Sequence, residues 1–132
     1  ALLEAGAAKD LQNNWGYTAM IVAAENNATE ALKALLEAGA AMDLQDNKGR
    51  TAMMLAAWNS APEAVKVLLE AEAAKDLQDN RGWTAMMWAA KANATEAVKA
   101  LLGAGAAKDY QDINGYTAMM WAAQHNATEA VK

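Results

Sequence analysis

The stretch Ala34-Leu35-Leu36-Glu37-Ala38-Gly39 decides the fold, because near-copies of it begin at Ala1, Val67 and Ala100. The sequence matches itself without a gap when it is shifted by 33 residues. Thr18-Ala19-Met20 recurs at Thr51, Thr84 and Thr117, and Glu30-Ala31-Leu32-Lys33 has counterparts at Glu63, Glu96 and Glu129. Periods of about 20 to 50 residues are typical of repeat proteins. We therefore predict one domain, residues 1–132, made of four repeats at 1–33, 34–66, 67–99 and 100–132.

Each repeat is predicted to contain a turn, a short helix, a second turn and a longer helix. The first turn is Asp46-Asn47-Lys48-Gly49 and its copies, in which glycine permits positive φ and Asp can accept local backbone hydrogen bonds. The first helix is expected from about Thr18 to near Asn27, Ser60, Asn93 or Asn126 in the successive repeats. The second helix is expected to start near Thr29, Pro62, Thr95 and Thr128.

Glycine is expected to end each second helix in the left-handed conformation, at Gly6, Gly39 and Gly105. Glu72 stands at the equivalent place in the remaining repeat. Because a side chain disfavours that conformation, this turn is predicted to be strained or differently shaped. A single repeat cannot bury its own apolar face, so the repeats are expected to stack around a continuous core.

Composition and charge restrict the classes of function. The chain is 55% hydrophobic and 20% charged, which is typical of a globular protein, and its net charge is −5. A nucleic-acid binder usually carries a basic face, and the sequence contains no basic stretch for a nucleic acid or a membrane surface. No apolar run approaches the roughly 18 residues that a membrane helix needs. Cysteine is absent, so disulfides are excluded.

The period of 33 and the order Asp-x-x-Gly-x-Thr, then Ala-Ala, Glu, Leu-Leu and Gly-Ala resemble the ankyrin repeat across all 132 residues. The resemblance implies an all-α solenoid of helix-turn-helix units with β-turn fingers. In that family the turns and first helices line a concave groove, and the second helices form the convex back. The resemblance also implies a protein-binding scaffold without catalytic activity or cofactor. It favours a cytoplasmic location, while an extracellular one stays open.

Several positions depart from the family pattern. The family's Thr-Pro-Leu-His appears as Thr18-Ala19-Met20-Ile21 and as Thr-Ala-Met-Met in the later repeats. The family histidine, which ties neighbouring repeats by hydrogen bonds, is therefore replaced by Ile21, Met54, Met87 and Met120. We expect the fold to survive, with small or flexible apolar groups in place of most polar links between repeats.

Aromatic and basic residues form the candidate binding site. By the family geometry, Trp15 and Trp83 lie on the fingers, with Tyr17, Arg50 and Tyr116 in the same fingertip position as Trp83. Trp, Tyr and Arg dominate interface hot spots, so this fingertip stripe is predicted to contact a partner. The complete set of predicted partner-binding residues is Trp15, Tyr17, Arg50, Trp58, Trp83, Lys91, Tyr116 and His125. The alternative is that the rings pack against neighbouring fingers, and Trp88 and Trp121 are expected to be partly packed.

Other residue patterns have plainer interpretations. The methionines at 20, 53, 54, 86, 87, 119 and 120 are interpreted as core filler. The aspartates at 10, 43, 76 and 109 are expected to accept turn hydrogen bonds and to compensate nearby lysines. His125 is the only histidine and has no Cys or second His to share a metal or a catalytic task, so neither an enzyme nor a metal site is predicted. Asn27-Ala28-Thr29 and its copies at Asn93 and Asn126 fit the N-glycosylation pattern, and their use depends on the compartment.

Two functional hypotheses follow. The first is a protein partner, with the acidic net charge favouring a neutral or basic surface on that partner. No nucleic acid, membrane or small-molecule substrate is expected. The second rests on the ends of the sequence, because Ala1 and Lys132 both fall within predicted second helices and neither end has a polar capping repeat. The chain is then either an excerpt of a longer array or a unit that stacks end to end into a filament.

Overall fold

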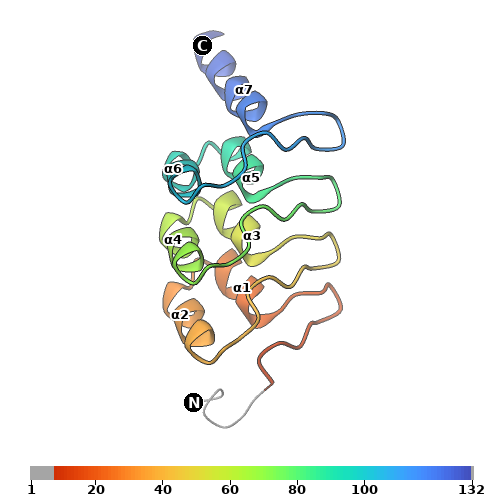
Figure 1. Cartoon of the computed structure of the whole chain (residues 1–132), viewed down its shortest axis with the longest axis vertical. Coiled ribbons are helices and arrows are strands. Elements are labelled where there is room, and N and C mark those ends of the chain that lie inside the picture. The colour runs from red at the N-terminus through yellow and green to blue at the C-terminus, as the bar shows by residue number, and fades with distance from the viewer. Residues whose placement is uncertain (1–7, 132) are drawn as a thin grey trace.

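The computed structural model describes the backbone of residues 8–131 and the side chains of residues 8–124. The helices of this part are α1 (Ala19–Glu25), α2 (Thr29–Glu37), α3 (Ala52–Trp58), α4 (Pro62–Glu70), α5 (Ala85–Lys91), α6 (Thr95–Gly103) and α7 (Ala118–Val131). Figure 1 shows α1, α3, α5 and α7 in one column, α2, α4 and α6 in a second, and extended loops projecting from the side of the first column. The predicted all-α solenoid is confirmed for the described residues.

The first helices begin at a threonine cap. Thr18 Oγ1 accepts a hydrogen bond from the Ile21 amide at 3.1 Å, and Thr84 Oγ1 accepts one from the Met87 amide at 3.3 Å. Helices α1, α3 and α5 have only seven residues each, too few to be stable alone, so their stability comes from burial. In the second repeat every residue of α3 from Ala52 to Ala57 is buried. The predicted starts and ends of these helices are confirmed in the first three repeats.

The turns between the helices of a repeat use the residues that the sequence predicts. Asn27, Ser60 and Asn93 have positive φ of 55°, 53° and 57°. Asparagine tolerates this conformation through local hydrogen bonding of its short side chain. The prediction fails in the last repeat, because α7 continues as one helix through Asn126 and Thr128. The second helices elsewhere bury leucines such as Leu32 and Leu101, and no leucine occurs between Asn126 and Lys132 to favour folding back.

The second helices end in the left-handed conformation. Gly39 has φ 80°, and the amide of Ala40 donates to the Leu35 carbonyl at 3.0 Å. Glu72 adopts φ 65° with the equivalent bond from Ala73 to Leu68 at 3.0 Å. This turn therefore has the ordinary shape, and the side chain of Glu72 makes it strained. Gly105 agrees with the prediction at φ 81°, and Gly6 lies outside the described residues.

The core lies between successive helices of both columns, and most of the methionines fill it as predicted. Met20, Met53, Met54, Met86 and Met87 are all buried. The prediction is wrong for Met119 and Met120, whose side chains are 75% and 47% exposed. Their counterparts in earlier repeats are covered by the first helix that follows, and no first helix follows α7 in the described part of the chain.

The projecting loops are the predicted fingers, residues 12–17, 45–50, 78–83 and 111–116, and they stack closely. The Asn80 amide donates to the Lys48 carbonyl at 3.0 Å, and the Ile113 amide donates to the Arg81 carbonyl at 2.9 Å. Gly16 has φ 81°, and a Cβ placed on it would lie 2.7 Å from the Asn47 amide nitrogen. Glycine is thus required both for the turn and for the approach of the next finger.

Side chains in the loops also join neighbouring repeats. Asp10, Asp43 and Asp76 accept hydrogen bonds from the backbone amides of Ala41, Ala74 and Ala107, each at 2.8 Å and 31 residues away. Gln12, Gln45 and Gln78 donate to the carbonyls of Gln45, Gln78 and Gln111. The expectation that these aspartates accept hydrogen bonds within their own turns is wrong, because Asp10, Asp43 and Asp76 bond to the next repeat. The expectation that most polar links between repeats are lost is also wrong, because the loops supply them.

Candidate functional site

Each finger in the last three repeats is built around a buried aspartate. Asp46 Oδ1 accepts from the amides of Lys48 and Arg50 at 2.9 and 2.8 Å, and Asp79 Oδ1 accepts from Arg81 and Trp83 at 2.9 Å. Asp112 makes the same pair of bonds. These are the turn hydrogen bonds that the Asp-x-x-Gly pattern predicts. They hold the first residues of each finger in one conformation.

The second oxygen of each carboxylate receives a side-chain donor that differs between repeats. Arg50 Nε donates to Asp46 Oδ2 at 2.8 Å, whereas the indoles of Trp88 and Trp121 donate to Asp79 and Asp112 at 3.1 and 3.3 Å. The first repeat has Val22 where these tryptophans stand, and its finger residue is the uncharged Asn13. A buried carboxylate oxygen without a donor is costly. This cost explains why each finger aspartate is accompanied by an arginine or tryptophan donor, whereas the first repeat, with Asn13, has none. No buried side-chain polar atom of the described residues lacks a partner.

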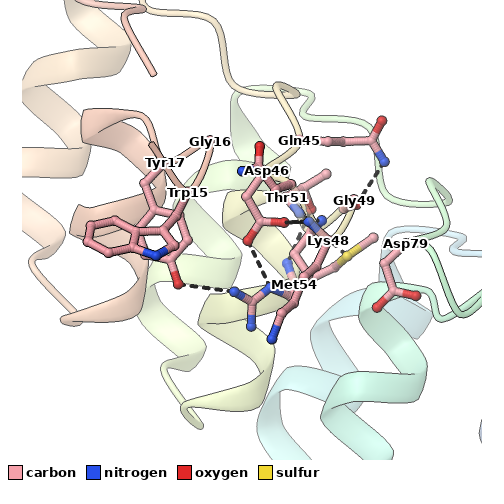
Figure 2. A network of polar contacts seen from close by, with 12 residues as sticks. Trp15, Gly16, Tyr17, Gln45, Asp46, Lys48, Gly49, Thr51, Met54 and Asp79 are labelled. Atoms are coloured by element: carbon pink, nitrogen blue, oxygen red, sulfur yellow. Dashed lines mark hydrogen bonds and ion pairs between the residues drawn. The ribbon is translucent and has the colours of Figure 1, made fainter. Parts of the chain in front are cut away.

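Arg50 joins the first two repeats. Its Nη2 donates to the Tyr17 hydroxyl at 3.0 Å, in addition to the ion pair with Asp46. Figure 2 draws both contacts as dashed lines to Tyr17 and Asp46. Burial lowers the pKa of Arg50, but the hydrogen bond and charge of Asp46 outweigh it and hold the pKa above its ordinary value. The guanidinium therefore stays charged, and its hydrogen bonds go to Asp46 in its own finger and Tyr17 in the preceding one.

Five rings form an aromatic cluster along the first helices and fingers of the second, third and fourth repeats. Its members are Trp58, Trp83, Trp88, Tyr116 and Trp121. The ring of Trp88 lies 5.3 Å from that of Trp58 and 4.7 Å from that of Trp83. The ring of Trp121 lies 5.0 Å from that of Trp83 and 4.6 Å from that of Tyr116. Offset and edge-on contacts at these distances are favourable, so the cluster is one continuous structure.

Two cations cover the cluster. The guanidinium of Arg81 lies 4.4 Å from the centre of the Trp83 ring and 5.3 Å from that of Trp88. The ammonium of Lys91 lies 4.9 Å from the centre of the Trp121 ring. Trp83 is consequently only 6% exposed. The expectation that Trp83 presents a fingertip ring is wrong, because Arg81 and the neighbouring rings enclose it.

The other predicted residues differ in how accessible they are. Trp15 is 69% exposed and Trp58 is 42% exposed, while Tyr17, Arg50, Lys91 and Tyr116 are partly buried. Trp88 and Trp121 are packed as expected. The side chain of His125 lies outside the described ones. Sequence reasoning missed Lys48 and Arg81, although they occupy the same repeat position as Trp15 and could have been found from it.

A hollow lies beside the second and third fingers. Its volume is about 350 Å³, and its lining residues are Lys48, Arg50, Asp79, Asn80, Arg81 and Trp88. Three of these side chains are cationic. Asp79 supplies the carboxylate, and both of its oxygens already accept hydrogen bonds.

Stacked helix pairs with projecting turn fingers define the molecule as a repeat solenoid. The family model described as ankyrin repeats (3 copies) matches residues 1–79 and 71–132, so the chain belongs to the ankyrin repeat family. Ankyrin repeats are in general protein–protein interaction modules and typically non-catalytic. A comparison with curated protein sequences gives no match. Within residues 8–131, no helix combines the length and apolarity needed to cross a membrane.

Proposed function

We propose that the chain is a non-catalytic scaffold that binds a protein partner across its first helices and fingers. The observation that carries this proposal is the aromatic cluster, which exposes Trp58 at its edge on a surface that also presents Trp15 and Lys91. Partly exposed tryptophans anchored by packed rings are the usual centre of an interface. His125 follows in sequence the position equivalent to Lys91 and is included in the proposed contact set.

The rigidity of this surface supports the proposal. The fingers are joined by backbone bonds such as Asn80 to Lys48, and by the glutamine bonds from repeat to repeat. A surface that is ordered before binding loses less conformational entropy when a partner docks. The partner therefore meets side chains already held in position.

The second helices offer a weaker case for binding. Their exposed faces carry ion pairs of Glu30 with Lys33, Glu63 with Lys66 and Glu96 with Lys99, at 3.7 to 3.8 Å. Exposed pairs of this kind are strongly hydrated and contribute little to stability. Charged residues such as Lys and Glu are also depleted from interface cores.

The proposal is tested by affinity capture with matched variants. Trp58→Ala removes the exposed ring, and the double change Glu63→Ala with Lys66→Ala removes an ion pair on α4. Partners retained by the wild type and by the α4 variant, but lost with Trp58→Ala, are expected. Circular dichroism and unfolding curves check that all variants fold. Partners lost only with the α4 variant would place binding on the other surface and overturn the proposal.

We propose end-to-end stacking as a second candidate function, because the last repeat exposes the residue types that are buried between repeats. Met119 is 75% exposed, whereas Met86 at the equivalent position is 3% exposed. Head-to-tail contacts that do not close generate filaments.

Light scattering over a range of concentrations tests the second candidate. A mass that grows with concentration for the wild type, and stays constant for Met119→Lys, would support stacking through this face. A constant monomer mass for both proteins would exclude it.

A further inference from the structure

Charge is divided unevenly between the two sides of the molecule. The fingers and first helices contain the basic residues Lys48, Arg50, Arg81 and Lys91. Their acidic residues are Glu25, Asp46, Asp79 and Asp112. The three aspartates are buried, and each accepts hydrogen bonds on both oxygens. Most of the remaining acidic residues lie on the second helices and the loops that follow them, so the surface proposed to bind a partner is close to neutral and the opposite side carries the net negative charge.

The hollow beside the second and third fingers is the part of this surface where cations outnumber carboxylates, with three basic side chains and one aspartate in its lining. Lys48 and Arg81 are exposed at its edge, and neither takes part in an ion pair among those of the described residues. Arg50 completes the set of cations in the lining. Asp79 offsets one of these three positive charges, but its oxygens accept hydrogen bonds from the amides of Arg81 and Trp83 and from the Trp88 indole, and it forms no ion pair with Lys48 or Arg81.

Arg81 is held in place without being neutralised. Its guanidinium is stacked near Trp83 and Trp88, at 4.4 and 5.3 Å from the ring centres. A stacked guanidinium keeps the N–H groups along its edge available, and those groups match the two oxygens of a carboxylate. Because the rings restrict its rotamers, less side-chain entropy is lost when an anion binds.

We infer that this hollow binds the carboxylate of an Asp or Glu side chain in an acidic segment of the partner protein. The inference rests on the proposed function and names the chemistry of one contact within it. It reverses the expectation from net charge that the partner surface is neutral or basic, because the local potential at the contact determines complementarity.

The same charge division favours a protein segment over a nucleic acid. A nucleic acid places a phosphate every few ångströms along an extended path and needs several basic contacts. Here two cations without an ion pair, Lys48 and Arg81, lie together at one hollow, and Asp43, Asp76 and Glu72 lie in the loops that precede the fingers. A single acidic side chain is therefore better matched to this surface than a polyanion.

The first experiment selects peptides from a random displayed dodecapeptide library on the immobilised wild-type chain. Enrichment of Asp or Glu at one position, together with apolar or aromatic neighbours, is expected. A fluorescently labelled copy of the selected peptide then gives dissociation constants. Replacing its acidic residue with the corresponding amide should weaken binding about tenfold, since a charge-assisted contact is lost.

Matched variants of the chain locate the contact. The double change Lys48→Ala with Arg81→Ala should weaken the acidic peptide by about tenfold and leave the amide peptide nearly unaffected. The double change Lys66→Ala with Lys99→Ala removes the same amount of charge from the second helices. It should leave the affinities of both the acidic peptide and the amide peptide unchanged. Arg81→Lys, combined with the native Lys48, should restore part of the affinity because the charge is kept.

The outcomes separate this inference from the proposed function. Selected peptides that lose binding with Trp58→Ala, but show no acidic enrichment, would overturn the carboxylate site and keep the binding surface. Peptides insensitive to Trp58→Ala would overturn the surface itself. Equal weakening of the acidic and amide peptides by the Lys48 and Arg81 changes would also contradict the inference. A single-stranded oligonucleotide that competes better than the acidic peptide would assign the hollow to phosphate instead.

Discussion

Glu72 shows how one residue can depart from its repeat without changing the local fold. It adopts φ 65° at the position where Gly39 and Gly105 end the other second helices. A Cβ added at Gly39 or Gly105 would meet no atom within 4 Å, so space is not the problem at these turns. The cost lies in the backbone, and a left-handed residue with a Cβ is disfavoured by about 1–2 kcal/mol.

Replacing Glu72 with glycine is therefore expected to stabilise the protein. We predict that Glu72→Gly raises the free energy of unfolding by about 1 kcal/mol, somewhat less than the full strain because glycine also makes the unfolded chain more flexible. Urea unfolding measures the change. Gly39→Ala is the control at an equivalent position and should lower the free energy by a similar amount. An unchanged stability of Glu72→Gly, with the control behaving as expected, would mean that the Glu72 side chain compensates its own strain.

At the scale of the element, each finger is organised by a carboxylate that needs a second donor. Arg50 supplies it in the second repeat, and Trp88 and Trp121 supply it in the third and fourth. Leu55 stands where the tryptophans do, and a leucine cannot donate. We therefore expect that an arginine at position 50 and a tryptophan at position 55 can each supply the second donor to Asp46.

A pair of substitutions in the second finger tests this exchange. Arg50→Leu should lower the free energy of unfolding by about 2 kcal/mol, because a buried oxygen of Asp46 loses its donor. Adding Leu55→Trp should recover a large part of that loss by placing an indole where Trp88 stands in the next repeat. Thermal or urea unfolding of the single and double variants completes the cycle. The idea fails if Leu55→Trp is equally destabilising with and without Arg50.

Most of the element boundaries could be predicted from the sequence, because they depend on local chemistry. Thr18, Gly39 and Pro62 mark helix ends through their own backbone preferences and hydroxyl groups, and the structure agrees with them. The predicted turn before the second helix is absent only at Asn126, because the other second helices fold back by burying leucines and residues 126–132 contain none.

The candidate site was less predictable, because its contacts join residues about one repeat apart. The family geometry placed Trp83 at a fingertip, but its burial depends on Arg81, Trp88 and Trp121 together. The bond between Arg50 and Tyr17 spans 33 residues and has no local signature. A fingertip charge such as Lys48 or Arg81 is usually a solvated surface group, and the repeat position shared with Trp15 is the one sequence signal that points to a further role.

At the scale of the whole molecule, the bonds of Asp43 and Asp76 couple neighbouring repeats, whereas Asp109 makes no such bond within the described residues. Asp43→Ala should therefore lower the free energy of unfolding by about 1 kcal/mol and increase hydrogen exchange at the Ala74 amide. Asp109→Ala is the matched control and should have little effect. Because stability in a repeat array is a sum of units and interfaces, Asp43→Ala should also broaden the unfolding transition. Equal effects of both substitutions would contradict this coupling.

One set of side-chain bonds between repeats bears on how such a chain can change in length. Gln12, Gln45 and Gln78, together with Asp10, Asp43 and Asp76, bond to the backbone of the following repeat, as Gln45 does to Gln78 and Asp43 does to Ala74. A backbone partner is supplied by any residue type except proline on the donor side. Recombination that duplicates or removes one period of 33 residues would therefore preserve these backbone bonds at the new junction, whatever side chains the joined repeats carry.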